Sequence, residues 1–115
     1  MKKLFVLIIC VFCVLSFTLA YAHPPQDIII TWDPATKMLH AVIKHNVSNT
    51  KTHYIKKADI GLNGKEIAEL KFSQQENNNE QTVSYLMPDA KTGDRLSVEG
   101  YCSISGSLTK EIVVK

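Results

Sequence analysis

Short apolar segments separated by turn-forming residues recur along most of this chain, and their spacing is the feature that most limits its fold. Turn signals come about every 8 to 12 residues, and Asn63-Gly64 is the dipeptide most typical of a two-residue β-hairpin. Leu96 and Val98 alternate with polar residues, as in a strand with one buried face. The pattern predicts seven strands, over residues 27–32, 38–45, 53–62, 65–72, 80–86, 95–102 and 108–114.

Seven short strands at this spacing favour an all-β fold, a seven-stranded antiparallel immunoglobulin-like sandwich. The cysteine–tryptophan–cysteine pattern of antibody domains is absent, so the prediction concerns architecture only. A chain of 115 residues is too short for a multidomain enzyme, and one domain is expected over residues 23–115. The sequence holds no P-loop, dinucleotide fingerprint, nucleophile elbow or HExxH motif.

The first 22 residues have the pattern of a signal peptide. Lys2 and Lys3 give a positive start, an apolar run over residues 4–19 follows, and Ala20-Tyr21-Ala22 is a cleavage signature. We therefore expect export to the periplasm or the extracellular space and no membrane attachment after cleavage. The mature chain would begin at His23 and keep a single cysteine, which cannot form an internal disulfide.

The charge balance argues against a nucleic-acid partner. Without Lys2 and Lys3 the 13 basic residues become 11, which equals the number of acidic residues. A protein that binds nucleic acid or an anionic membrane needs a basic surface instead.

A few histidines and one cysteine are the residues on which a functional prediction can rest. His45 and His40 have opposite strand parity and point to opposite faces, whereas His45 and His53 flank one polar loop. Cys102 also ends a predicted strand, and strand ends of a sandwich meet at its poles. A thiolate with two or more imidazoles suits iron, copper or zinc. Exposed histidines and a core cysteine are the alternative interpretation.

Two motifs resemble the desulfoferrodoxin/superoxide reductase iron-binding domain. The first is HNVSNTKTHYI at residues 45–55, followed by Asn63-Gly64, and the second is YCSISG at residues 101–106 before a final EIVV strand. The resemblance covers about residues 38–115. It implies a seven-stranded immunoglobulin-like fold and a mononuclear non-haem iron held by four imidazoles and an axial thiolate. The activity implied is one-electron reduction of superoxide to peroxide, with superoxide or an electron-donor protein as partner.

Carried onto this sequence, the resemblance makes His45 and His53 two of the imidazole ligands and Cys102 the axial thiolate. Ser105 stands where the family has a further histidine ligand, and the early Glu-Lys-His motif has no counterpart. These departures predict an altered site in which superoxide turnover is lost or reduced.

His23 supports a second hypothesis. An N-terminal histidine can bind copper through its α-amine and Nδ1 together, with another imidazole completing a T-shaped copper site. His23 is thus a candidate fourth ligand, and a non-enzymatic copper or iron carrier is the alternative function. A metal-free sandwich used for protein contact is the third.

Overall fold

The computed structural model describes residues 23–115. The predicted signal peptide, residues 1–22, lies outside the described residues. Within the described part of the chain, no helix is long and apolar enough to cross a membrane.

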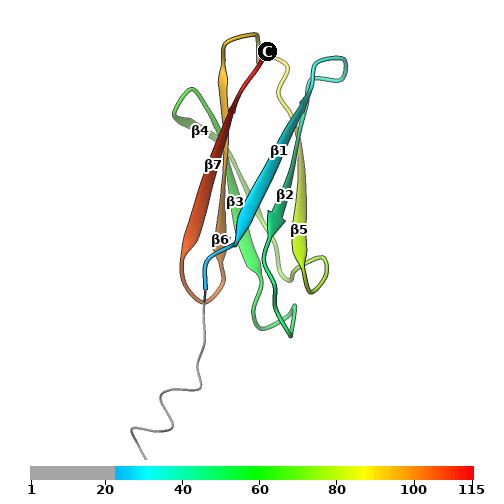
Figure 1. Cartoon of the computed structure of the whole chain (residues 1–115), viewed down its shortest axis with the longest axis vertical. Helices are drawn as coiled ribbons and strands as arrows, with labels where there is room; N and C mark the ends of the chain where they lie inside the picture. The colour runs from blue at the N-terminus through cyan, green and yellow to red at the C-terminus, as the bar shows by residue number, and fades with distance from the viewer. Residues whose placement is uncertain (1–22) are drawn as a thin grey trace, which may run out of the picture.

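The described chain is an antiparallel sandwich of two sheets (Figure 1). Strands β1, β2 and β5 form one sheet in that order, and the other has the order β4-β3-β6-β7. The fold class predicted from the sequence is therefore confirmed. The strands are β1 (Asp27–Asp33), β2 (Met38–Lys44), β3 (Ile55–Leu62), β4 (Lys65–Lys71), β5 (Glu80–Leu86), β6 (Arg95–Cys102) and β7 (Ser107–Val113).

The division of strands into three and four differs from that of a constant-type antibody domain, in which the fourth strand joins the first sheet. Here β4 pairs with β3 instead, because the Asn63-Gly64 turn folds it directly back. Asn63 and Gly64 both have positive φ, 52° and 83°, as a type I′ turn requires. The predicted hairpin is confirmed.

Alternating side chains form the core between the sheets. On β2 the buried positions are Leu39, Ala41 and Ile43, and on β6 they include Leu96 and Val98. Burying each of the larger aliphatic side chains contributes roughly 1.5–3 kcal/mol to folding. Period-two alternation in the sequence therefore reports which face of β2 and of β6 packs inward.

One pole of the sandwich gathers segments from four places in the sequence. The loop after β2 bonds to the β4–β5 connection, with Val47 N donating to Asn78 O at 2.8 Å and Gln75 N donating to Thr50 O at 3.0 Å. The β6–β7 turn lies at the same pole, and the segment that leads into β1 enters there (Figure 1). This pole contains the candidate site.

Candidate metal centre

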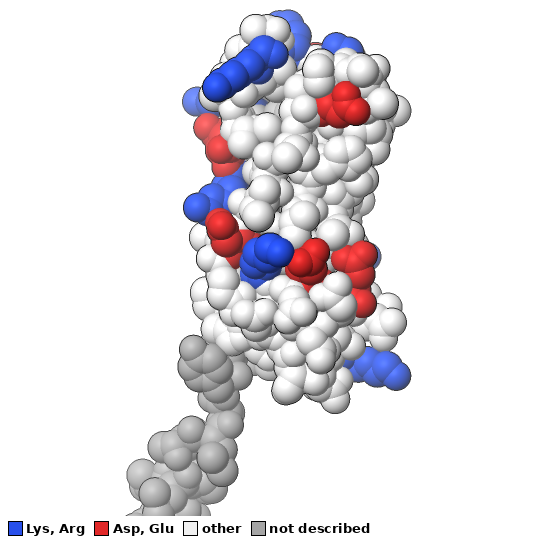
Figure 2. All heavy atoms as spheres, turned by 45° about the vertical axis from the view of Figure 1, so that its right-hand side comes forward, with Lys and Arg blue, Asp and Glu red and all other residues white. Residues whose placement is uncertain are grey.

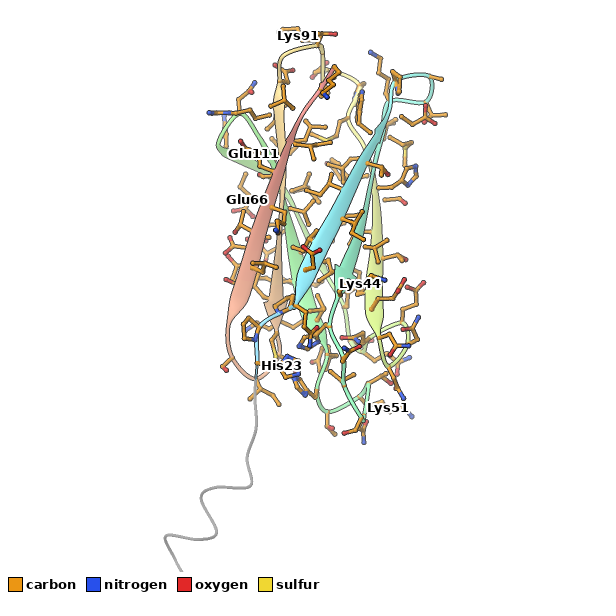
Figure 3. All side chains as sticks on the ribbon, viewed as in Figure 1. His23, Lys44, Lys51, Glu66, Lys91 and Glu111 are labelled. Atoms are coloured by element: carbon orange, nitrogen blue, oxygen red, sulfur yellow. The ribbon has the colours of Figure 1, made fainter. Side chains whose placement is uncertain are left out.

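Three imidazoles meet at this pole. His23 precedes β1, His45 follows the last residue of β2, and His53 lies two residues before β3. The ring centroids of the three pairs are 4.8, 4.9 and 4.8 Å apart. One nitrogen from each ring belongs to a set of potential ligand atoms that all lie within 4.8 Å of one another. In Figure 3, His23 lies at this end of the sandwich and Lys91 lies at the other end.

Strand parity delivers His45 to the site. It continues the inward series of Leu39, Ala41 and Ile43 one step past the end of β2, and its side chain is fully buried. His40, of opposite parity, points outward, and its Nδ1 lies 2.8 Å from Ser84 Oγ. The prediction that these two histidines face opposite ways is confirmed.

His45 is held by a buried amide. Its Nδ1 lies 2.9 Å from Oε1 of Gln75, a residue only 2 % exposed. The polar run at residues 73–79 predicts an exposed loop, and for Gln75 this prediction is wrong. The side chain turns inward because it satisfies three backbone groups at the pole: the Ile55 amide and the carbonyls of His45 and Asn77. No periodic signal in the polar run distinguishes this glutamine from its neighbours.

His53 brings an unpartnered nitrogen. Its Nε2 is buried and has no hydrogen-bond partner, and the only other such side-chain atom among residues 23–115 is Asp59 Oδ1. Burial lowers the pKa of His53, and the nearby His45 and His23 lower it further. Each effect disfavours the imidazolium form. A neutral imidazole is the form of histidine that binds a metal.

His23 is fixed by backbone contacts. Its Nε2 lies 3.0 Å from Asn46 O, and its Nδ1 lies 3.0 Å from Pro24 O. Gly106 of the β6–β7 turn, with φ of 86°, packs against Pro24, and a Cβ added there would lie 3.0 Å from Pro24 Cβ. Glycine in this turn therefore lets the segment with His23 lie close to the sandwich.

Cys102 is not a member of the histidine group, which consists of His23, His45 and His53. It lies at the same pole, paired with Ile55 across β3 and β6, but its side chain is 2 % exposed and lies on the core side of the strand. Its Sγ accepts a hydrogen bond from Ile104 N at 3.5 Å. Ser105 is exposed in the turn that follows. Of the four ligands predicted from the sequence, the structure brings together His23, His45 and His53.

The three imidazoles fit a transition-metal ion. Nitrogens that share one zinc ion at about 2.0–2.1 Å lie about 3.4 Å apart. A set within 4.8 Å therefore has to close by about an ångström or slightly more to share one ion. Imidazole ligands suit zinc, copper, iron and nickel and are unsuited to magnesium and calcium. Burial of His45 and the unpartnered Nε2 of His53 are the observations that distinguish this group from a chance surface cluster.

A second group of potential ligands, which the sequence interpretation did not single out, lies on the outer face of the four-stranded sheet. Asp59 on β3 and Glu66 and Glu69 on β4 have carboxylate oxygens within 4.8 Å of one another. Both glutamates are exposed, and Lys57 lies 3.6 Å from Asp59 and 3.4 Å from Glu69. The ammonium group already provides a counter-charge on this face.

Comparison with protein-family models, curated proteins and solved structures gave no match to this chain. The resemblance to superoxide reductase therefore depends on the two sequence motifs and stays a prediction.

Proposed function

We propose that this protein is an exported metal-binding protein that holds one transition-metal ion through the imidazoles of His23, His45 and His53. The observation that carries the proposal is the convergence of three rings from distant segments on one half-buried point. The unpartnered Nε2 of His53 and the depressed pKa of that residue support it.

Copper is the ion that this donor set favours. Affinities of nitrogen sites for divalent metals rise along the first transition series to copper. Cleavage after Ala22 would add the α-amine of His23 as another nitrogen donor close to two further imidazoles. Binding and transfer of copper, without redox turnover, then describes the function.

Iron and superoxide reduction are the second candidate. One observation favours them: Cys102 lies at the same pole, at the start of the turn that packs against Pro24. If the resemblance to superoxide reductase holds, Cys102 would bind the iron as a thiolate and would supply electron density to it. The Cys102 side chain would have to leave its contact with the Ile104 amide and turn toward the imidazoles.

Metal titration tests the proposal. The protein used is residues 23–115, which contain both sheets and the core described between them. We expect one copper ion to bind per chain, more tightly than zinc or ferrous iron. His23→Ala should weaken binding strongly, and an extra alanine before His23 should weaken it in part by blocking the α-amine.

The matched control is His40→Ala. His40 is an exposed histidine outside the group, and its removal should leave the affinity unchanged. Equal losses for His23→Ala and His40→Ala would overturn the proposed site. For the second candidate, a thiolate-to-ferric absorption band that disappears in Cys102→Ala would favour iron over copper.

A further inference from the structure

Gln75 and His45 are the two polar side chains that are almost completely buried at the pole with the three histidines. Gln75 comes from the β4–β5 connection and makes four hydrogen bonds. Its side-chain amide contacts the ring of His45, one of the three candidate ligands. The same amide bonds to Ile55, the first residue of β3, and so links His45 to that strand.

The orientation of the Gln75 amide is fixed by its neighbours. Nε2 lies 2.7 Å from the carbonyl oxygen of His45 and 2.8 Å from that of Asn77, so this atom must be the donor. The other end, Oε1, accepts a hydrogen bond from Ile55 N at 3.1 Å. An amide flipped end for end would place oxygen against two carbonyl oxygens and nitrogen against an N–H, so only one orientation satisfies all three backbone groups.

A fixed amide also fixes the proton on His45. Because Oε1 can only accept, His45 Nδ1, 2.9 Å away, must carry the hydrogen in this contact. In the neutral ring Nε2 then has a free lone pair. Nε2 lies 3.2 Å from the carbonyl oxygen of His23, a contact that would favour the opposite tautomer. The two oxygens therefore compete for one proton, and the shorter contact belongs to Gln75.

We propose that Gln75 is the positioning residue of the metal site: it holds His45 in the Nδ1–H tautomer and so directs the Nε2 lone pair toward the ion. This inference deepens the proposed function and rests on it. Metal-bound histidines commonly donate their second ring N–H to a neighbouring acceptor, and loss of that acceptor typically weakens metal binding 10- to 100-fold. Here a neutral amide is the acceptor, so it orients His45 without adding negative charge to the site.

Nitrogen-15 NMR of the imidazoles tests the tautomer directly. We expect the metal-free native protein, at a pH well above 6.5 where a free imidazole is neutral, to show a protonated Nδ1 and an unprotonated Nε2 on His45. A protonated Nε2 with an unprotonated Nδ1 would overturn the inference. Because no metal is present, this result is independent of whether the proposed function holds.

Two substitutions separate positioning from loop anchoring. Gln75→Met and Gln75→Glu both remove the donor bonds to His45 O and Asn77 O, but only glutamate keeps an oxygen facing His45 Nδ1. We expect Gln75→Met to shift His45 toward the Nε2–H tautomer and to weaken copper binding 10- to 100-fold. Gln75→Glu should keep the Nδ1 proton and bind copper at least tenfold more tightly than Gln75→Met does.

Equal losses of affinity in the two variants would show that Gln75 merely anchors the loop, and the inference would fail. The NMR measurement on the native protein still decides the tautomer if either variant does not fold. A native protein with the expected tautomer that binds no metal would remove the proposed function and, with it, the metal-directing role of Gln75.

Discussion

The two groups of potential metal ligands in this molecule have similar spacing but different surroundings. The histidine group and the acidic group of Asp59, Glu66 and Glu69 each place three ligand atoms within 4.8 Å of one another. His45 is fully buried and His53 half-buried, whereas two of the three acidic residues are exposed. Proximity of ligand atoms therefore does not separate the two groups.

Their electrostatics do separate them. In the histidine group, burial lowers the pKa of His53, so an ion that binds this imidazole has less need to displace a proton from it. On the acidic face, burial alone would lower the pKa of Lys57, but the carboxylates of Asp59 and Glu69 outweigh this effect and raise it. A metal ion would compete there with a lysine that is already paired. The surface in Figure 2 likewise shows positive and negative side chains intermixed.

Among the substitutions that test this difference between the two groups, His53→Phe should have the largest effect on copper binding. It removes one of three ligands and should weaken copper binding by more than the roughly 100-fold upper value for loss of a supporting residue. The metal-free protein should be at least as stable as the native one, because an unpartnered buried nitrogen costs about 1–3 kcal/mol. Copper titration and urea unfolding of the metal-free protein measure the two effects.

A variant that loses both copper binding and stability would show that His53 serves the fold, and the histidine group would lose its distinction from an ordinary packed cluster. His40→Ala is the control for nonspecific loss of a histidine.

Gly106→Ala should disturb the pole of the sandwich that contains the three histidines and leave the acidic group on the sheet face unchanged. Gly106 has φ of 86°, where a side chain is strained, and its Cβ would lie 3.0 Å from Pro24. The strain costs about 1–3 kcal/mol, and displacement of Pro24 moves His23. We expect a lower unfolding midpoint and weaker copper binding. As a comparison, Gly93→Ala has similar strain at φ of 93°, but its added Cβ would meet no atom within 4 Å beyond the adjacent residues, so it should lower stability without affecting copper binding.

The stability of the metal-free protein should rise with pH near neutrality. The pKa of His53 is lowered in the folded protein relative to about 6.5 in the unfolded chain. Between these two values the unfolded chain holds a proton that the folded protein lacks, so the free energy of unfolding increases with pH. The contribution is complete above about pH 6.5 and is lost as the pH falls toward the folded pKa.

Urea unfolding between about pH 5 and pH 7.5 measures this slope, which one proton limits to about 1.4 kcal/mol per pH unit. The slope should decrease in His53→Phe. An unchanged slope in that variant would assign the effect to another group.

Periodicity predicted much of the fold and part of the site. Alternation along residues 38–45 predicted that His40 and His45 face opposite ways, and Asn63-Gly64 predicted the hairpin that places β4 beside β3. These features follow from local rules, namely strand parity and turn geometry. The strand ends were less well predicted, since β3 begins at Ile55 and not at residue 53.

The remaining features depend on contacts between distant segments. His23 reaches the other histidines because Pro24 packs on Gly106. Gln75 is buried because it bonds to backbone groups of two other segments, Ile55 N and His45 O. No periodic pattern records either contact. Cys102 was correctly placed at a strand end, but parity at the last residue of β6 turns its side chain toward the core.

Asp59→Asn should have the smallest effect on stability and copper affinity. It tests the difference between the two groups most directly, because it changes a ligand of the acidic group alone. The substitution removes one of the two carboxylates that form ion pairs with Lys57. This pair, at 3.6 Å, is partly exposed and contributes about 0–1 kcal/mol. Glu69 still pairs with Lys57, so stability should change little. Because the acidic face takes no part in the proposed site, copper affinity should equal that of the native protein within error. A loss of copper binding comparable to that of His53→Phe would show that carboxylates on the sheet face hold the ion, and burial would then be the wrong criterion for choosing between the two groups.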